Sequence, residues 1–225
     1  MHMINKLHII WDLDGTLIDS EQEVLEALIK SVRAVGLMEE NQKSPFRVGP
    51  TVDKILEASF DSSVLTEMKK MEIIKNFRTN YDNCGFNHTP PFDGIEQILK
   101  DSIFIHHIVT NKPDLATNRI IEKLGWKTYF ASVVTPYSYM KSANDKRKSK
   151  SELFALCMAD YPKAKFVGIG DMDTDAKAAL DNNIPAIGVL WGTGTREELE
   201  KCGCNYIISE VSELYKTLAK LQVKI

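Results

Sequence analysis

The sequence predicts an α/β fold, with a doubly wound parallel sheet and an inserted helical domain. Three observations lead to this expectation. Residues 7 to 20 begin with a short apolar run that stops at Gly15, a pattern typical of a buried strand followed by a turn. Residues 20–88 have helical periodicity and few strand-like stretches. From Phe92 onward, strand-like and helix-like segments alternate, which favours parallel strands joined by right-handed crossovers.

The inserted segment divides the chain into two expected domains. Residues 1–19 and 89–225 would form the α/β core, and residues 20–88 a separate helical domain. Ser20 followed by Glu23 matches a capping box at the start of the insert. The helices expected there cover residues 21–35, 52–60 and 64–81.

The remaining segments follow in alternation, and all of them belong to the expected core. In open sheets of this kind, ligands bind beyond the carboxyl ends of the strands, where the strand order reverses. The expected strands are 103–109, 132–135, 165–169, 186–190 and 206–208, and the expected helices are 94–101, 115–124, 152–159, 175–181, 196–201 and 211–221.

Composition and charge argue against several classes of partner. The formal net charge is -3 and no basic stripe is present, so nucleic acid is not an expected partner. No apolar run approaches the roughly 20 residues that a membrane helix needs. The N-terminal apolar run is too short and too acidic for a signal peptide, and the cysteines show no disulfide or zinc spacing. We expect a cytoplasmic protein, a monomer or homodimer, with no membrane partner.

Acidic and polar side chains gather where the expected strands end. Asp12 and Asp14 are two positions apart, so on an extended chain they point the same way. Two such carboxylates repel each other unless a cation or a proton lies between them. Thr110–Asn111 and Asp171 follow two later strands. The pattern suggests a magnesium-dependent reaction on a phosphate, because Mg²⁺ prefers oxygen ligands.

At these residues the chain resembles the haloacid dehalogenase superfamily, in particular its phosphoglycolate-phosphatase-like members. The resemblance covers nearly the whole length and implies a Rossmann-like core with a helical cap, residues 20–88. It is carried by Asp12–Thr16, Ile108–Lys112, a lysine ahead of a helix, Gly170–Asp175, Pro90–Ile95, Gly188–Gly192 and Arg196–Leu199, and more weakly by Val48–Pro50 and Phe77–Tyr81.

The resemblance implies a role for each acidic residue. Asp12 would be the nucleophile and form an aspartyl-phosphate. Asp14 would protonate the leaving oxygen and then take a proton from the attacking water. Mg²⁺ would be held by the Asp12 side chain, the Asp14 backbone carbonyl and Asp171. Asp175, one helical turn beyond Asp171, would act through water or as an orienting group.

Phosphate-binding groups and a cation complete the expected site. Thr110 and Asn111 offer a hydroxyl, an amide and backbone N–H groups to phosphate oxygens, whereas Lys112 is expected to face solvent. Lys150 fits the family variant in which lysine lies two residues before a glutamate, and Lys148 fits the alternative spacing.

The expected function is hydrolysis of a phosphate monoester. The substrate would be a small phosphorylated metabolite, such as phosphoglycolate, a nucleotide or a sugar phosphate. Two alternatives stay open. One is a sugar phosphomutase of the β-phosphoglucomutase type, which uses the same aspartyl-phosphate. The other is a non-catalytic binding module on the same fold.

Overall fold

The computed structural model describes residues 6–49, 51–138 and 147–224. The chain divides into two compact units, and each is described here by itself. Residues 1–19 and 91–225 form one unit, called the core unit below, and residues 20–90 form the other, called the insert unit.

Within the described residues, the core unit holds one six-stranded sheet in which every strand pair is parallel. The strands are β1 (Leu7–Trp11), β2 (Phe104–Val109), β3 (Phe130–Val134), β4 (Lys165–Gly170), β5 (Ala186–Val189) and β6 (Tyr206–Ile208). Their order across the sheet is β3-β2-β1-β4-β5-β6. The chain therefore builds outward from β1 in one direction and then returns to build in the other. The reversal lies between β1 and β4, the place where open α/β sheets bind ligands.

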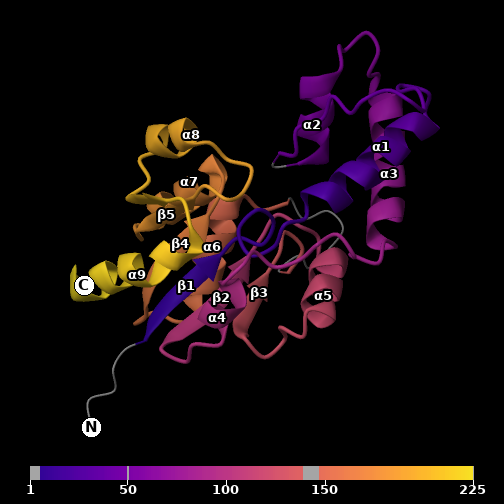
Figure 1. Ribbon diagram of the computed structural model, residues 1–225. Coiled ribbons are helices and arrows are strands. Elements are labelled where there is room, and N and C mark those ends of the chain that lie inside the picture. The colour runs from indigo at the N-terminus through magenta and orange to yellow at the C-terminus, as the bar shows by residue number, and fades with distance from the viewer. Residues whose placement is uncertain (1–5, 50, 139–146, 225) are drawn as a thin grey trace. The chain divides into compact units, whose positions relative to one another are not determined.

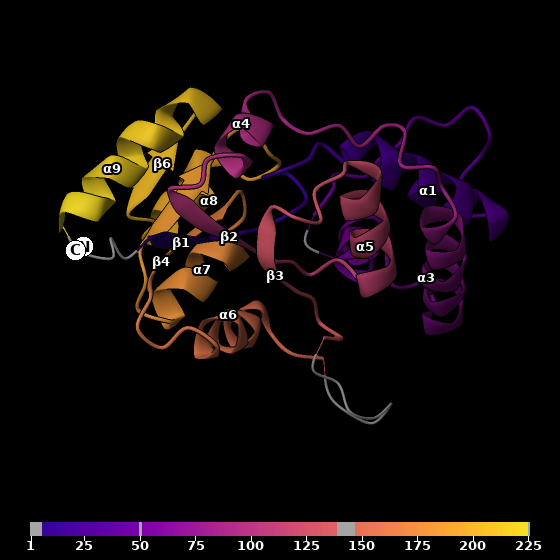
Figure 2. The same ribbon diagram turned by 90° about the horizontal axis from the view of Figure 1, so that it is seen from below.

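Helices cover both faces of this sheet. They are α4 (Ile95–Leu99), α5 (Asp114–Lys123), α6 (Lys150–Ala159), α7 (Asp173–Asp181), α8 (Arg196–Lys201) and α9 (Leu214–Lys224), with a 3₁₀ turn at Val211–Glu213. Figures 1 and 2 show α6 and α7 on one face of the sheet and α4 and α9 on the other. The predicted doubly wound α/β class is confirmed.

Burial explains why β1 is apolar at every position except His8. A parallel strand covered on both faces has a nearly continuous apolar sequence and not an alternating one. All of its residues from Leu7 to Trp11 are buried. On one face Ile10 packs with Phe154 of α6 and Ala179 of α7 in a single apolar cluster. The first strand therefore lies at the centre of the core, and its carboxyl end is held firmly.

The histidines of β1 and β2, His8, His106 and His107, are buried and packed in the core. A buried hydrogen bond of 2.9 Å joins His8 Nδ1 to His107 Nε2, and His107 Nδ1 lies 2.8 Å from Ser132 Oγ. Trp11 Nε1 donates to His106 Nδ1 over 3.0 Å. Burial lowers the pKa of His107 to about 3 and that of His106 to about 4. Both rings are therefore neutral at ordinary pH.

These buried histidines make the protein sensitive to acid. An unfolded histidine takes up a proton near pH 6.5, whereas folded His107 does so only near pH 3, so stability falls as the pH drops through this window. Between pH 6.5 and 4.5 the protonation of one such histidine costs about 2 kcal/mol. We expect His107→Asn to flatten the pH dependence of the free energy of unfolding by that amount, as measured by urea denaturation. His88→Gln, at an exposed histidine, is the control. An unchanged slope in the His107 variant would contradict this assignment.

The insert unit is built from three helices in its described part, α1 (Glu21–Ala34), α2 (Val52–Ser59) and α3 (Glu67–Asp82). Helices α1 and α3 pack together, and Asn80 Nδ2 donates to Ser31 Oγ over 2.9 Å. The capping box predicted at Ser20 is wrong, because the Ser20 side chain makes no cap hydrogen bond. Glu23 instead accepts the backbone N–H of His88 at 2.6 Å.

Other element boundaries shift by a few residues from those predicted. Helix α3 begins at Glu67 and not at residue 64, because Thr66 caps it by accepting the Lys69 N–H. Helix α6 begins at Lys150 and not at residue 152, because Ser149 and Glu152 form a true capping box.

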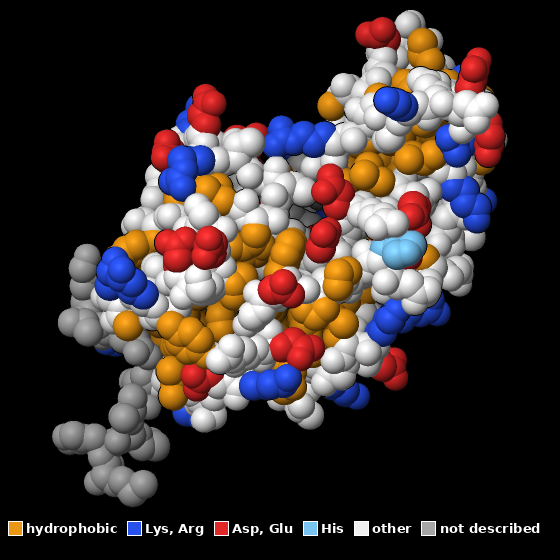
Figure 3. All heavy atoms as spheres, viewed as in Figure 1, with side chains coloured by type: hydrophobic (Ala, Val, Ile, Leu, Met, Phe, Trp, Pro, Cys, Tyr) orange, Lys and Arg blue, Asp and Glu red, His pale blue; other side chains and the backbone are white. Residues whose placement is uncertain are grey.

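No helix in the described ranges is both long and apolar enough to cross a membrane. Acidic and basic side chains are interspersed on the face shown in Figure 3.

Candidate active site

The first part of the site is the turn that follows β1. Asp12 comes directly after the strand, and its N–H donates to Ile169 O of the neighbouring β4 at 2.9 Å. Gly15 has φ +75°, a left-handed conformation that favours glycine. A Cβ at Gly15 would also overlap the carboxylate of Asp171. The turn therefore brings the backbone of the first motif against the carboxylate that follows β4.

Three carboxylates meet at this edge of the sheet. Asp12, Asp171 and Asp175 are all buried, and each offers one oxygen within 4.8 Å of the others. Asp171 Oδ1 accepts from Thr16 Oγ1 at 3.1 Å. Asp175, in the first turn of α7, accepts the Met172 N–H at 3.0 Å. The strand ends thus gather acidic groups that the sequence separates by more than 150 positions.

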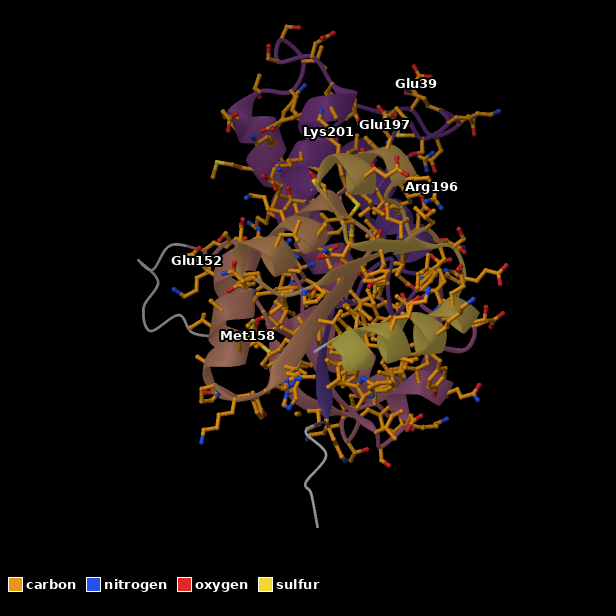
Figure 4. The ribbon with its side chains drawn as sticks, turned by 90° about the vertical axis from the view of Figure 1, so that its left-hand side faces the viewer. Glu39, Glu152, Met158, Arg196, Glu197 and Lys201 are labelled. Carbon is orange, nitrogen blue, oxygen red and sulfur yellow. The ribbon has the colours of Figure 1, made fainter. Side chains whose placement is uncertain are left out.

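The cation among these carboxylates is Lys150. Its Nζ lies 2.6 Å from Asp12 Oδ1 and also pairs with Asp175 Oδ1. Lys150 is the first residue of α6, where the capping box of Ser149 and Glu152 fixes the start of the helix; Glu152 is labelled in Figure 4. Of the two lysines predicted for this role, the structure brings Lys150 to the site and leaves Lys148 half-buried outside it.

Burial or neighbouring charges raise the pKa values of Asp12, Asp171 and Lys150. Burial raises the pKa of Asp12 to about 7, although the neighbouring Lys150 opposes the rise. Burial, reinforced by the charge of Asp12, raises the pKa of Asp171 to about 6. Burial alone would lower the pKa of Lys150, but Asp12 and Asp175 together hold it above its usual range. Three buried carboxylates with one ammonium among them leave an excess of negative charge.

This excess fits a divalent cation. The donors are all carboxylate oxygens, the ligands that Mg²⁺ prefers, and the two carboxylates with clearly raised pKa values, Asp12 and Asp171, offer oxygens within 4.8 Å of each other. Both oxygens of Asp175 already have protein partners, Lys150 and the Met172 N–H. The residues present therefore fit a magnesium ion between Asp12 and Asp171, with Asp175 beside it.

The end of β2 supplies the other side of the site. Thr110 is buried, and its Oγ1 accepts the Lys112 N–H at 3.1 Å. Asn111 is half-buried, and its carbonyl accepts from Arg147 Nη2 at 3.1 Å. The prediction that Lys112 faces solvent is wrong. Its side chain is only 5% exposed, and Nζ lies 2.9 Å from Asp14 Oδ1.

One contact of Asp171 comes from a residue that sequence reasoning missed. Thr193, just after β5, donates to Asp171 Oδ2 from its N–H at 2.9 Å and from its Oγ1 at 3.1 Å. The signal available was a Gly–Thr–Gly stretch at the end of another strand of the same sheet. Nothing in the sequence pairs that threonine with an aspartate about 20 positions earlier.

Comparison with known proteins identifies the family. The family model described as haloacid dehalogenase-like hydrolase matches residues 9–189, which include all of the site except Thr193. The chain belongs to this family. The predicted family and enzyme class, a phosphatase-type haloacid dehalogenase-like hydrolase, are confirmed.

Relatives of this hydrolase carry several phosphatase names. It is 27% identical over 190 residues to a phosphoglycolate phosphatase of Aquifex aeolicus, covering 82% of this chain and 84% of that one. It is 23% identical to a 5'-nucleotidase of Pseudomonas aeruginosa, covering 94% and 95%. A crystal structure of a predicted phosphatase from Clostridium acetobutylicum superposes with a TM-score of 0.78 at 29% identity, covering 96% and 99%.

Proposed function

We propose that this haloacid dehalogenase-like hydrolase is a magnesium-dependent phosphate-monoester hydrolase that works through an aspartyl-phosphate on Asp12. The observation that carries the proposal is the pairing of the buried Asp12 carboxylate with Lys150 at 2.6 Å, beside Asp171. The Lys150 ammonium opposes the rise that burial causes in the pKa of Asp12 and holds the carboxylate in position, and both effects favour its action as a nucleophile. Names of relatives support phosphate esters as the substrate class.

The proposed reaction has two displacements at phosphorus. In the first, an oxygen of Asp12 attacks phosphorus while the bond from phosphorus to the leaving oxygen breaks, and Asp14 gives that oxygen a proton. In the second, Asp14 takes a proton from water, the water oxygen attacks the phosphorus of the aspartyl-phosphate, and Asp12 is released. Lys150 offsets negative charge in both steps. Thr110 and Asn111 hold the phosphoryl oxygens.

Magnesium would be held by the Asp12 side chain, the Asp14 carbonyl and Asp171, with Asp175 keeping Lys150 in place. When bound, the ion neutralises charge on the phosphoryl oxygens and helps to orient the phosphate. Lys150 would hold Oδ1 of Asp12, the oxygen with which it pairs. The separate roles of the ion and of Lys150 account for the presence of both an acidic cluster and a buried lysine.

The insert unit, residues 20–90, would select the substrate as a helical cap. It is compact in itself, and in the sequence it follows the segment that carries Asp12 and Asp14. Sites on a shared scaffold diverge most readily in such added segments. We propose a small phosphorylated metabolite as the substrate, phosphoglycolate, a nucleotide or a sugar phosphate, with no nucleic-acid or membrane partner.

Removal of the metal tests the proposal directly. We expect EDTA to lower the release of phosphate from p-nitrophenyl phosphate at least about 100-fold, because a bound ion contributes several kcal/mol to such reactions. Added Mg²⁺ should restore the rate. A rate that survives exhaustive chelation would contradict the metal requirement.

A screen of phosphorylated metabolites distinguishes the alternatives. Free phosphate from phosphoglycolate, nucleotides or sugar phosphates supports a hydrolase. Conversion of β-glucose 1-phosphate to glucose 6-phosphate without phosphate release would show a mutase instead. Absence of turnover on every substrate, p-nitrophenyl phosphate included, would indicate a binding module.

A further inference from the structure

The segment that follows β5, Trp191–Gly192–Thr193–Gly194, is called the β5 loop here. Its threonine donates two hydrogen bonds to one oxygen of Asp171, at 2.9 Å from the backbone N–H and at 3.1 Å from Oγ1. The other oxygen of Asp171 accepts from Thr16 at 3.1 Å. A carboxylate that is held through both oxygens cannot rotate, so its remaining lone pairs point in fixed directions.

The β5 loop also lies directly against the backbone of both acidic motifs. A Cβ on Gly192 would overlap Gly15 O and the side chain of Asp171, and a Cβ on Gly194 would overlap Asp171 O. Trp191 Nε1 donates to Thr16 O at 3.0 Å. Gly192 and Gly194 permit this close approach because they have no side chain. The hydrogen bonds of Trp191 and Thr193 stabilise it. The loop thus ties the turn after β1 to the residue after β4.

Charge adds a reason for this arrangement. Asp171 is buried and close to Asp12, so two like charges are held near each other. Neutral donors can hold such a carboxylate in place without neutralising it, which leaves its charge available to a cation. A lysine in the position of Thr193 would compete with that cation.

We propose that Thr193 is a positioning residue for Asp171 and that the β5 loop, by orienting this carboxylate, contributes to Mg²⁺ binding. The inference rests on the proposed function and deepens it. Mg²⁺ demands near-ideal octahedral geometry, so it is sensitive to the direction of each ligand. Groups that orient a metal ligand in this way typically change metal affinity by about 10–100-fold when they are removed.

The test compares Mg²⁺ binding to the full-length protein and to threonine variants by isothermal titration calorimetry. Thr193→Val keeps the shape of the side chain and removes its hydroxyl, and we expect its dissociation constant for Mg²⁺ to rise about 10-fold. Thr193→Ala should show the same weakening without any risk of a clash. Thr193→Ser keeps the hydroxyl and should restore binding. The apparent KM for Mg²⁺ should rise in the first two variants, while kcat at saturating Mg²⁺ changes far less.

A nearby threonine provides the matched control. Thr195 caps α8 through Glu198 and contacts neither aspartate in the hydrogen bonds of the described residues. Thr195→Val should lower the melting temperature and leave the Mg²⁺ dissociation constant unchanged. This separates a loss of stability from a loss of metal affinity.

One outcome would contradict the inference about the β5 loop, and another would contradict the metal role in the proposed function. If Asp171→Asn loses Mg²⁺ binding while Thr193→Val and Thr193→Ala bind as tightly as the wild type, the inference about the β5 loop fails and the proposed function stands. If the wild-type protein binds no Mg²⁺, the metal role in the proposed function fails first.

Discussion

Replacement of Asp12 with asparagine is expected to lower the rate of phosphate release by about 10⁴-fold or more, because the amide cannot act as the nucleophile. The two side chains have nearly the same shape, so packing at the end of β1 is preserved. Lys150 keeps a partner in Asp175. Initial rates with p-nitrophenyl phosphate, together with a thermal unfolding curve, separate a lost nucleophile from a lost fold.

Asp19 supplies a control on the same connection. It is exposed, a few residues beyond the turn, and has no part in the proposed chemistry. Asp19→Asn should keep a rate within about two-fold of the wild type, as surface substitutions usually do. If Asp12→Asn retained a rate comparable to that of Asp19→Asn, Asp12 would not be the nucleophile.

Lys150→Met is expected to have the second-largest effect, on both rate and stability. The substitution leaves two carboxylates, Asp12 and Asp175, buried without their cation. Loss of one partner from a buried ion pair costs about 3–5 kcal/mol of folding free energy. The loss of charge stabilisation should lower kcat by about 10²–10³-fold.

The destabilisation of Lys150→Met should itself depend on pH. Lys150 lowers the pKa values of Asp12 and Asp175, so both values rise further when it is removed. The folded variant then binds protons that the unfolded chain has already released, and its stability increases as the pH falls. The difference in free energy of unfolding from the wild type should therefore be larger at pH 8 than at pH 5, as measured by urea denaturation in the absence of metal.

Lys148→Met is the matched control for this prediction. It removes the same charge two residues away, from a half-buried side chain outside the carboxylate cluster. Its rate and stability should stay close to those of the wild type. Equal losses in the Lys148 and Lys150 variants would show that the ion pairs with Asp12 and Asp175 are not what holds the nucleophile.

Much of the fold follows from local patterns in the sequence. A nearly continuous apolar run such as Leu7–Trp11, broken only by His8, has few stable places other than the centre of a parallel sheet. The carboxyl ends of such strands meet at one edge, so the sequence alone predicts that Asp12 and Asp171 converge. Element ends were less predictable, because a single capping contact, such as that of Thr66 with Lys69, moves a helix start by several residues.

The details of the site depend on contacts between distant segments. Lys112 looks like a solvated lysine in a loop, and only the fold brings Asp14 to its ammonium group. Glu23 matches a local capping box, yet the chain near His88 offers it a better donor. The sequence likewise does not indicate that Thr193 contacts Asp171, because this contact also joins two separate segments of the chain. Such partners are set by tertiary packing, which local periodicity does not encode.

The most direct measurement is to stop a single turnover with acid and locate the phosphoryl group on the enzyme by mass spectrometry. We expect the mass of one phosphoryl group on the peptide that contains Asp12, removed by hydroxylamine as an acyl phosphate should be, and absent from Asp12→Asn. A phosphoryl group on another residue, or turnover that passes through no phosphorylated enzyme, would contradict the assignment of Asp12 as the nucleophile.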